Sequence, residues 1–160
     1  RNDKYDIAYE ATEITEKFIR YGRENNIKVK NLNIDCMDFS NNSFDCVLCY
    51  DVLNHQTDYK KGVMELIRVA KKEVIISFFK PFICDKDFEK ALGKQFPSKV
   101  SKHGIIQDRI SNVFNRTNLI YHFFDKKVLL EFLNSLDISY NFETIHGKQI
   151  LFIKKDQFFK

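Results

Sequence analysis

The sequence predicts an α/β fold whose mostly parallel sheet ends in an antiparallel hairpin. Short apolar runs at residues 29–34, 44–50 and 73–79 alternate with segments whose apolar residues recur at helical spacing. Near the C-terminus, two further runs are separated only by His146 and Gly147, which is typical of a tight hairpin turn. Alternating strands and helices indicate parallel strands joined by crossover helices.

The composition indicates one folded domain and excludes several classes of protein. Apolar residues make up 44% of the chain and charged residues 30%, so the chain can bury a core. The formal net charge is only +4, and the basic residues are mixed with acids, which disfavours a nucleic-acid surface. No apolar run is long enough to span a bilayer. The five glycines form no glycine-rich phosphate loop of either common type.

The N-terminus and the cysteines bear on domain organisation and location. Because the chain begins with Arg1 in a charged run, we expect residues 1–160 to be a single domain that is N-terminally incomplete. Cys46 and Cys49 lie in one expected strand, where residues three apart point to opposite faces and cannot share a metal ion. We therefore predict buried free thiols, no metal site and a cytoplasmic protein.

The first half of the chain is expected to contain four strands and two helices. A strand at residues 5–10 ends in Glu10, and a helix then follows Thr12, with Ile14, Phe18 and Tyr21 at helical spacing. The next strand, at 29–34, is followed by Asp35. The strand at 44–50 is almost wholly apolar, which predicts burial on both faces. A helix beginning at residue 57 or 58 leads into the strand at 73–79.

The second half is less regular before it becomes ordered again. We expect a helix at 85–96 and a loop or short helix at 99–118. Asp125 is expected to cap a helix whose apolar face contains Val128, Leu129, Phe132 and Leu133. Strands at 138–145 and 149–154 then form the hairpin.

Two acids follow consecutive expected strands, at the edge where parallel sheets bind ligands. Glu10 ends one strand and Asp35 follows the next. A carboxylate in this position can accept hydrogen bonds from a ribose diol, and a second acid could accept from an adenine amino group. Each acid could instead cap the segment that follows it. The pair favours a nucleoside ligand.

The run from Asn33 to His55 carries a resemblance to a known family. It contains an acid after a strand, a turn, Ser43-Phe44-Asp45, an apolar strand and Val52-Leu53-Asn54-His55. This order, and the Glu-x-x-Arg-Val pattern that begins at Glu65, resemble class I S-adenosylmethionine-dependent methyltransferases. The resemblance covers roughly residues 5–79. It implies a Rossmann-like three-layer sandwich with S-adenosylmethionine as the cofactor.

The resemblance also implies roles for individual residues. Glu10 would bind the ribose hydroxyls, Ala11 would lie against the adenine, and Asp35 would accept from the adenine amino group. Cys36 or Met37 would contact the adenine ring, and Tyr50 would lie near the methionine part of the cofactor.

Two features depart from the family pattern. Lys71-Lys72-Glu73 stands where the family has Lys-Pro-Gly-Gly. The family's first strand and its glycine-rich loop are missing, because they would precede Arg1. A central strand that is missing leaves two strand edges exposed, so we expect residues 1–160 alone to be unstable and to bind S-adenosylmethionine poorly.

The implied reaction is methyl transfer from a sulfonium to an acceptor, in which the protein mainly positions the reactants. His55 is the candidate general base, although it could simply pack at a helix start. Tyr121 and His122 are candidates for the acceptor pocket, although they could be core residues. We expect a small-molecule acceptor. A methyltransferase of RNA or protein, and a non-catalytic methyltransferase-like partner subunit, remain alternatives, whereas the sequence context disfavours a nicotinamide enzyme.

Overall fold

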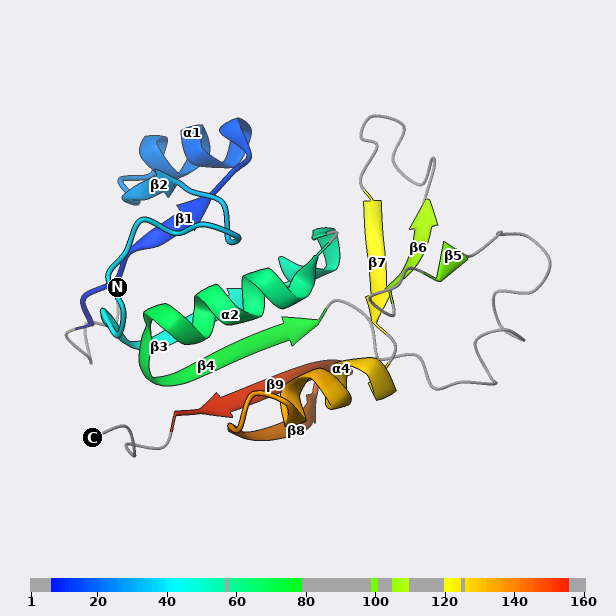
Figure 1. Cartoon of the computed structure of the whole chain (residues 1–160). Coiled ribbons are helices and arrows are strands. Elements are labelled where there is room, and N and C mark those ends of the chain that lie inside the picture. The colour runs from blue at the N-terminus through cyan, green and yellow to red at the C-terminus, as the bar shows by residue number, and fades with distance from the viewer. Residues whose placement is uncertain are drawn as a thin grey trace. The chain divides into compact units, whose positions relative to one another are not determined.

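The structure is a computed structural model that describes residues 7–56, 58–78, 99–100, 105–109, 120–124 and 126–155. The chain forms two compact units, residues 1–38 and residues 39–160. The expected helix at 85–96 lies outside the described residues, as does Asp125. Figure 1 labels the helices and strands used below.

The first unit contains two short parallel strands and one helix. Strand β1 (Ala11–Glu13) pairs with β2 (Val29–Asn31), and α1 (Glu16–Glu24) connects them. Gly22 faces β2 at close range, since a Cβ atom on this residue would lie 2.6 Å from Cγ2 of Val29. The helix can approach the strand this closely only because residue 22 has no side chain.

Both strands of this unit differ from the sequence prediction. The strand expected at 5–10 is wrong in position, because β1 begins at Ala11, immediately after Glu10. The strand expected at 29–34 ends at Asn31, and a turn follows at residues 34–35. A pair of three-residue strands carries too little pattern for its ends to be read from the sequence.

The predicted apolar face of α1 is also wrong. Ile14, Phe18 and Tyr21 are exposed by 55%, 59% and 62%, whereas Ile19 and Gly22 are buried. The residues that face β2 are therefore one position away from the stripe that the spacing indicated. Because Phe18 and Ile19 are neighbours, a rotation of about 100° around the helix axis exchanges one face for the other.

The second unit is built on a four-stranded sheet in the order β3-β4-β9-β8. The parallel pair consists of β3 (Phe44–Tyr50) and β4 (Ala70–Phe78), joined by the short 3₁₀ helix η1 (Leu53–His55) and by α2 (Tyr59–Val69). Strands β8 (Ser139–Ile145) and β9 (Lys148–Lys154) form the antiparallel hairpin, and β9 adds to β4 (Figure 1). The predicted mixed sheet and hairpin are confirmed.

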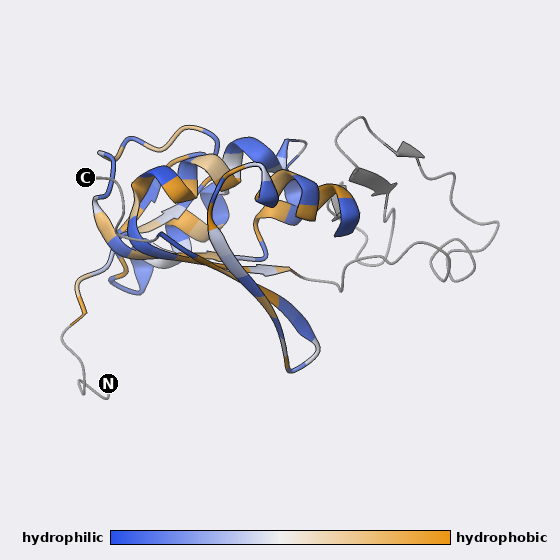
Figure 2. Cartoon of the chain, turned by 60° about the horizontal axis from the view of Figure 1, so that its bottom comes forward, coloured by the Kyte–Doolittle hydropathy of each residue, from blue (hydrophilic) through white to orange (hydrophobic). Residues whose placement is uncertain are grey.

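Helices cover one face of this sheet, and residues of the other face are exposed. Helix α2 packs on β3 and β4, and Tyr59 at its start contacts Phe132 of α4 (Lys126–Asn134), with ring centroids 5.9 Å apart. Val74 and Ile76 of β4, with Leu151 of β9, are fully buried. Along β3 the alternate residues Leu48 and Tyr50 are 72% and 68% exposed, so burial of β3 on both faces is wrong. Figure 2 shows that hydrophilic and hydrophobic residues are interspersed along the strands and helices.

A third group of strands begins in the stretch 99–118, where the prediction of a loop or short helix is wrong for residues 99–100 and 105–109. Strands β5 (Lys99–Val100), β6 (Ile105–Arg109) and β7 (Ile120–Phe124) form an antiparallel sheet. The apolar pairs Ile105–Ile106 and Ile120–Tyr121 lie within β6 and β7. They were too short to be recognised as strands without the partner that completes the ladder.

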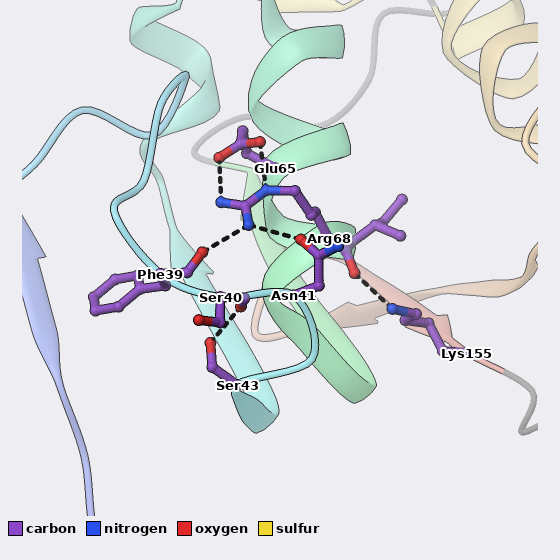
Figure 3. Close-up of polar contacts among 8 residues, drawn as sticks. Phe39, Ser40, Asn41, Ser43, Glu65, Arg68 and Lys155 are labelled. Carbon is purple, nitrogen blue, oxygen red and sulfur yellow. Dashed lines mark hydrogen bonds and ion pairs between the residues drawn. The ribbon is translucent and has the colours of Figure 1, made fainter.

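Figure 3 shows a polar network at the amino edge of the parallel pair. Arg68 of α2 binds both carboxylate oxygens of Glu65, at 2.7 and 2.8 Å, and also donates to Phe39 O at 2.6 Å and to Asn41 Oδ1 at 3.0 Å. Lys155, directly after β9, donates to Asn42 Oδ1 at 2.7 Å, Ala70 O at 2.8 Å and Ile67 O at 3.0 Å. The network therefore ties the end of α2 to the 39–43 turn and to the hairpin.

Candidate functional site

The carboxyl edge of the first unit places Glu13, not Glu10, at the end of a strand. Glu13 is half-buried, and its Oε1 accepts hydrogen bonds from the backbone N–H groups of Ile14 and Thr15, both at 2.8 Å. Glu10 precedes β1 and forms an exposed ion pair with Lys30 at 3.1 Å. The reason given for choosing Glu10, its position at a strand end, is therefore wrong. Glu13 satisfies that criterion.

The second predicted acid lies on the loop that follows β2. Asp35 is half-buried, and its backbone N–H donates to Oδ1 of Asn33 at 3.1 Å. Cys36 is exposed and Met37 is buried, so Met37 contributes to the core of the chain. Ala11 begins β1 instead of following a strand end. Because β1 and β2 are parallel, the carboxylates of Glu13 and Asp35 follow the carboxyl ends of neighbouring strands.

At the carboxyl edge of the second unit, four polar residues from three strand ends form one cluster. Tyr50 ends β3, Asp51 follows it, Ser77 lies near the end of β4, and Lys148 begins β9. Lys148 Nζ donates to Asp51 Oδ2 at 2.5 Å and to the Tyr50 hydroxyl at 2.7 Å. The same ammonium lies 4.1 Å from the centroid of the Tyr50 ring, within the range of a cation–π interaction. We call these four residues the carboxyl-edge cluster.

Asp51 is held in place by its backbone and by both carboxylate oxygens. Its φ of 56° is in the left-handed region that non-glycine residues seldom adopt. The Ser77 hydroxyl donates to Asp51 Oδ1 at 2.7 Å and accepts from the Asp51 backbone N–H at 3.0 Å. The hydrogen bond from Lys148 to Asp51, with a smaller contribution from Tyr50, raises the pKa of the Lys148 ammonium. Lys148 is therefore a cation throughout the neutral range.

His55, the predicted base, is the last residue of η1 and is exposed. Its neighbours Leu53 and Asn54 are buried, which anchors this turn just beyond β3. The Cα atoms of η1 and β7 come within 8 Å of one another. Strand β7 contains Tyr121 and His122, so the structure places the backbone of the predicted acceptor segment beside the predicted base.

Thiols and metal ligands contribute little to this edge. Cys49 is buried on the helix-covered face of β3, and desolvation raises the pKa of its thiol to about 12, so it is not a nucleophile at neutral pH. Cys46, three residues earlier and on the opposite face, is exposed, as is Cys36, so the prediction of buried thiols is wrong for these two. Among the residues that the structure describes, no three histidines, cysteines and acids gather in a way that could hold a metal ion.

Sequence reasoning missed Glu13, Ser77 and Lys148 as candidate site residues, and it noted Asp51 only as a strand-end position. Ser77 did leave a signal, because it is the one hydroxyl in the apolar run 74–79. Lys148 left a weaker one, as the first residue after the hairpin turn. Neither signal indicates a shared site, because Asp51 and Lys148 are 97 residues apart in sequence.

Acids after neighbouring parallel strands, in an α/β protein, define the class of domains that bind nucleotides at the carboxyl edge of the sheet. Sequence comparison identifies the class more closely. Residues 3–78 match the profile of a family described as the methyltransferase domain. No curated protein sequence matches the chain.

Solved structures share the fold at low sequence identity. A methyltransferase from Methanosarcina mazei, described as S-adenosylmethionine-dependent, matches at 17% identity with a TM-score of 0.64, covering 91% of this chain and 81% of its own. Magnesium protoporphyrin IX methyltransferase from Synechocystis matches at 15% identity and a TM-score of 0.58, covering 92% of this chain and 64% of its own. A 1,6-didemethyltoxoflavin-N1-methyltransferase from Burkholderia thailandensis matches at 14% identity and 0.56, with coverages of 92% and 61%.

Residues 3–78 match the methyltransferase domain family, and the fold of the chain is that of the Rossmann-like methyltransferases. The family match supports the predicted class of enzyme, a methyltransferase, and the matching solved structures include one described as S-adenosylmethionine-dependent. None of the helices in the described ranges combines the length and apolar character needed to cross a membrane.

Proposed function

We propose that this chain transfers a methyl group from S-adenosylmethionine to a small-molecule acceptor, and that Glu13 and Asp35 hold the adenosine part of the cofactor. The observation that carries the proposal is the pair of half-buried carboxylates after β1 and β2, inside the segment that matches the methyltransferase domain. Carboxylates in this position accept hydrogen bonds from ribose hydroxyls and from an adenine amino group.

Glu13 fits the ribose-binding role better than Glu10. Its Oε1 accepts from the backbone N–H groups of Ile14 and Thr15, which fixes the carboxylate in one orientation. Glu10 is exposed, and its carboxylate is paired with Lys30. A preorganised acceptor loses less freedom when a ligand binds, so Glu13 is the stronger partner for the ribose diol.

Bound S-adenosylmethionine supplies a methyl group that is already activated on a sulfonium. The chain's own residues then have two tasks, to orient the acceptor and, where the acceptor must lose a proton, to receive that proton. His55 is the base that we propose for the second task, because it is exposed at the end of η1 and lies beside β7. Tyr121 and His122 of β7 are the residues that we propose for the acceptor side.

A small molecule is the acceptor class that the comparisons favour. Two of the similar structures are named for acting on a porphyrin and on a didemethyltoxoflavin, both of which are small molecules. The net charge of +4 is dispersed along the sequence, which gives no dense basic surface for nucleic acid. Incubation with S-adenosylmethionine labelled in its methyl group, followed by separation of small molecules, RNA and protein, tests this. Label confined to RNA or protein would contradict the proposal.

The cofactor site is tested by titrating the complete protein with S-adenosylhomocysteine. We expect Glu13→Gln to weaken binding about tenfold to a hundredfold, because a charged acceptor of two hydrogen bonds is lost. Glutamine keeps an oxygen that can accept from the N–H groups of Ile14 and Thr15. Glu10→Gln is the matched control and should change the affinity by less than about twofold.

Other results lead to other conclusions. A loss with Glu10→Gln alone would return the ribose-binding role to Glu10. An unchanged affinity in both variants would remove this edge from the cofactor site. Failure of the unaltered protein to bind S-adenosylhomocysteine would favour a non-catalytic partner subunit.

A further inference from the structure

The carboxyl-edge cluster lies on the face of the sheet that α2 does not cover. Tyr50 pairs in register with Ser77, and Ser77 with Ile150, so all three occupy one row across β3, β4 and β9. Lys148 is two residues from Ile150 and therefore points to the same face. From there its side chain crosses the end of β4 to reach Tyr50 and Asp51.

The inner half of the cluster has its hydrogen-bonding groups occupied by the chain itself. Each oxygen of the Asp51 carboxylate accepts one bond, from Ser77 and from Lys148. The Ser77 hydroxyl both donates and accepts, and its side chain is almost fully buried. Asp51 and Ser77 therefore hold the cluster in place on its buried side, and they offer no further donor to a ligand.

The outer half of the cluster retains two donors. An ammonium has three N–H bonds, and Lys148 uses two of them within the described residues. The Tyr50 oxygen accepts from Lys148, while its own O–H proton has no acceptor in the described part of the chain. Tyr50 is 68% exposed and Lys148 has 30% of its side chain exposed, so a ligand can reach both donors.

The charge of the cluster selects the kind of ligand. The Lys148 ammonium is already paired with Asp51, so it can bind one further anionic oxygen from a ligand that carries a single negative charge. A phosphate dianion would be repelled by the fixed Asp51 carboxylate, whereas a carboxylate presents two oxygens to two donors at lower cost.

We propose that Tyr50 and Lys148 form a carboxylate-binding subsite at the carboxyl edge of the sheet. The ligand carboxylate accepts one hydrogen bond from the Tyr50 hydroxyl and one from the Lys148 ammonium. The proposal rests on the proposed function for the identity of the ligand, since we assign the carboxylate to the methyl acceptor. A carboxylate of the cofactor is the other outcome that the test distinguishes.

Titration calorimetry on the complete protein distinguishes the two sources. The ligands are S-adenosylhomocysteine, 5′-methylthioadenosine, which lacks the amino-acid end, and benzoate added to protein saturated with S-adenosylhomocysteine. The variants are Tyr50→Phe, Lys148→Met and Lys148→Arg. The matched control is Lys154→Met, an exposed lysine of the same strand. Tyr50→Phe removes only an exposed hydroxyl, so it remains folded even if Lys148→Met does not.

If the subsite binds the carboxylate of the cofactor, Tyr50→Phe and Lys148→Met weaken the binding of S-adenosylhomocysteine about tenfold or more. The affinity for 5′-methylthioadenosine then changes by less than about twofold. If the subsite binds the carboxylate of the methyl acceptor, both variants leave the affinity for S-adenosylhomocysteine unchanged and weaken the binding of benzoate by a comparable factor. In either case Lys148→Arg keeps the cation and should restore most of the affinity.

The subsite is overturned if neither variant changes either ligand by more than about twofold, or if Lys154→Met causes the same loss. It is also overturned if the unaltered protein binds S-adenosylhomocysteine no more tightly than 5′-methylthioadenosine and does not bind benzoate. Failure of the proposed function looks different, because then neither adenosine compound binds. Benzoate is then titrated into the protein alone, and that titration still tests the subsite.

Discussion

The two edges of the parallel pair β3–β4 each use a lysine from the hairpin, but they use it differently. At the amino edge, Lys155 donates all three of its N–H bonds to oxygens of the chain, and the guanidinium of Arg68 binds four more (Figure 3). At the carboxyl edge, Lys148 donates only two, beside an exposed tyrosine. The amino edge is closed by its own contacts, whereas the carboxyl edge keeps donors for a ligand.

Backbone geometry shows the same difference. At the amino edge, Arg68 donates to the main-chain carbonyl of Phe39, and Lys155 donates to those of Ile67 and Ala70. These bonds stabilise the end of α2 and the 39–43 turn. At the carboxyl edge the bonds join side chains to one another, and Asp51 adopts a positive φ. Sparsely populated backbone conformations at a ligand-binding edge are consistent with preorganisation for function. The comparison predicts that stability and binding can be separated by mutation.

The largest stability effect is expected at Arg68. Arg68→Met removes a bidentate ion pair and the bond to Phe39 O, and it leaves that carbonyl without its donor. We expect the free energy of unfolding to fall by about 2–3 kcal/mol, measured by urea denaturation. The affinity for S-adenosylhomocysteine should stay within about twofold. Lys61→Met, on the exposed face of α2, is the control and should leave stability nearly unchanged.

Lys155→Met should have a smaller effect of the same kind. Burial lowers the pKa of Lys155, so part of the gain from its three hydrogen bonds is offset by the cost of desolvating the ammonium. We expect a loss of about 1–2 kcal/mol in the free energy of unfolding, again with little change in cofactor affinity. A loss of affinity without a loss of stability would contradict the separation of the two edges.

The smallest effect is a pH dependence at Lys148. The pKa of this ammonium is raised in the folded protein, above the ordinary lysine value of 10.5. Its contribution to stability is therefore fully present below pH 10.5 and is lost as the pH rises through the folded pKa. Between pH 9 and pH 12, the unaltered protein should lose more stability than Lys148→Met, in parallel thermal melts. Equal losses would show that Lys148 is not coupled to Asp51.

Patterns that are long or uninterrupted allowed correct predictions. Strand β3 was predicted from a long apolar run, and helix α2 from apolar residues at helical spacing. The hairpin turn was predicted from His146-Gly147, and both of these residues have a positive φ. Short elements gave the errors. β1 has only three residues, and the sequence prediction placed the end of this strand at Glu10 instead of Glu13.

The candidate site could be predicted only where its residues are near in sequence. Tyr50, Asp51 and His55 follow one strand, so a single rule about strand ends indicates all three. Lys148 enters the same edge because β9 pairs antiparallel with β4, which brings the hairpin turn beside the end of β4. No local pattern in the sequence encodes that pairing, because it depends on contacts between distant strands.

The central claim is that ligands bind at the carboxyl edges and not at the amino edge. Amide shifts of the complete ¹⁵N-labelled protein, recorded as S-adenosylhomocysteine is added, test it most directly. The account predicts the largest shifts at residues 13–16 and 33–37, and little change at residues 39–43 and 155. Equal shifts at the amino edge, or no shift at residues 13–16 and 33–37, would contradict it.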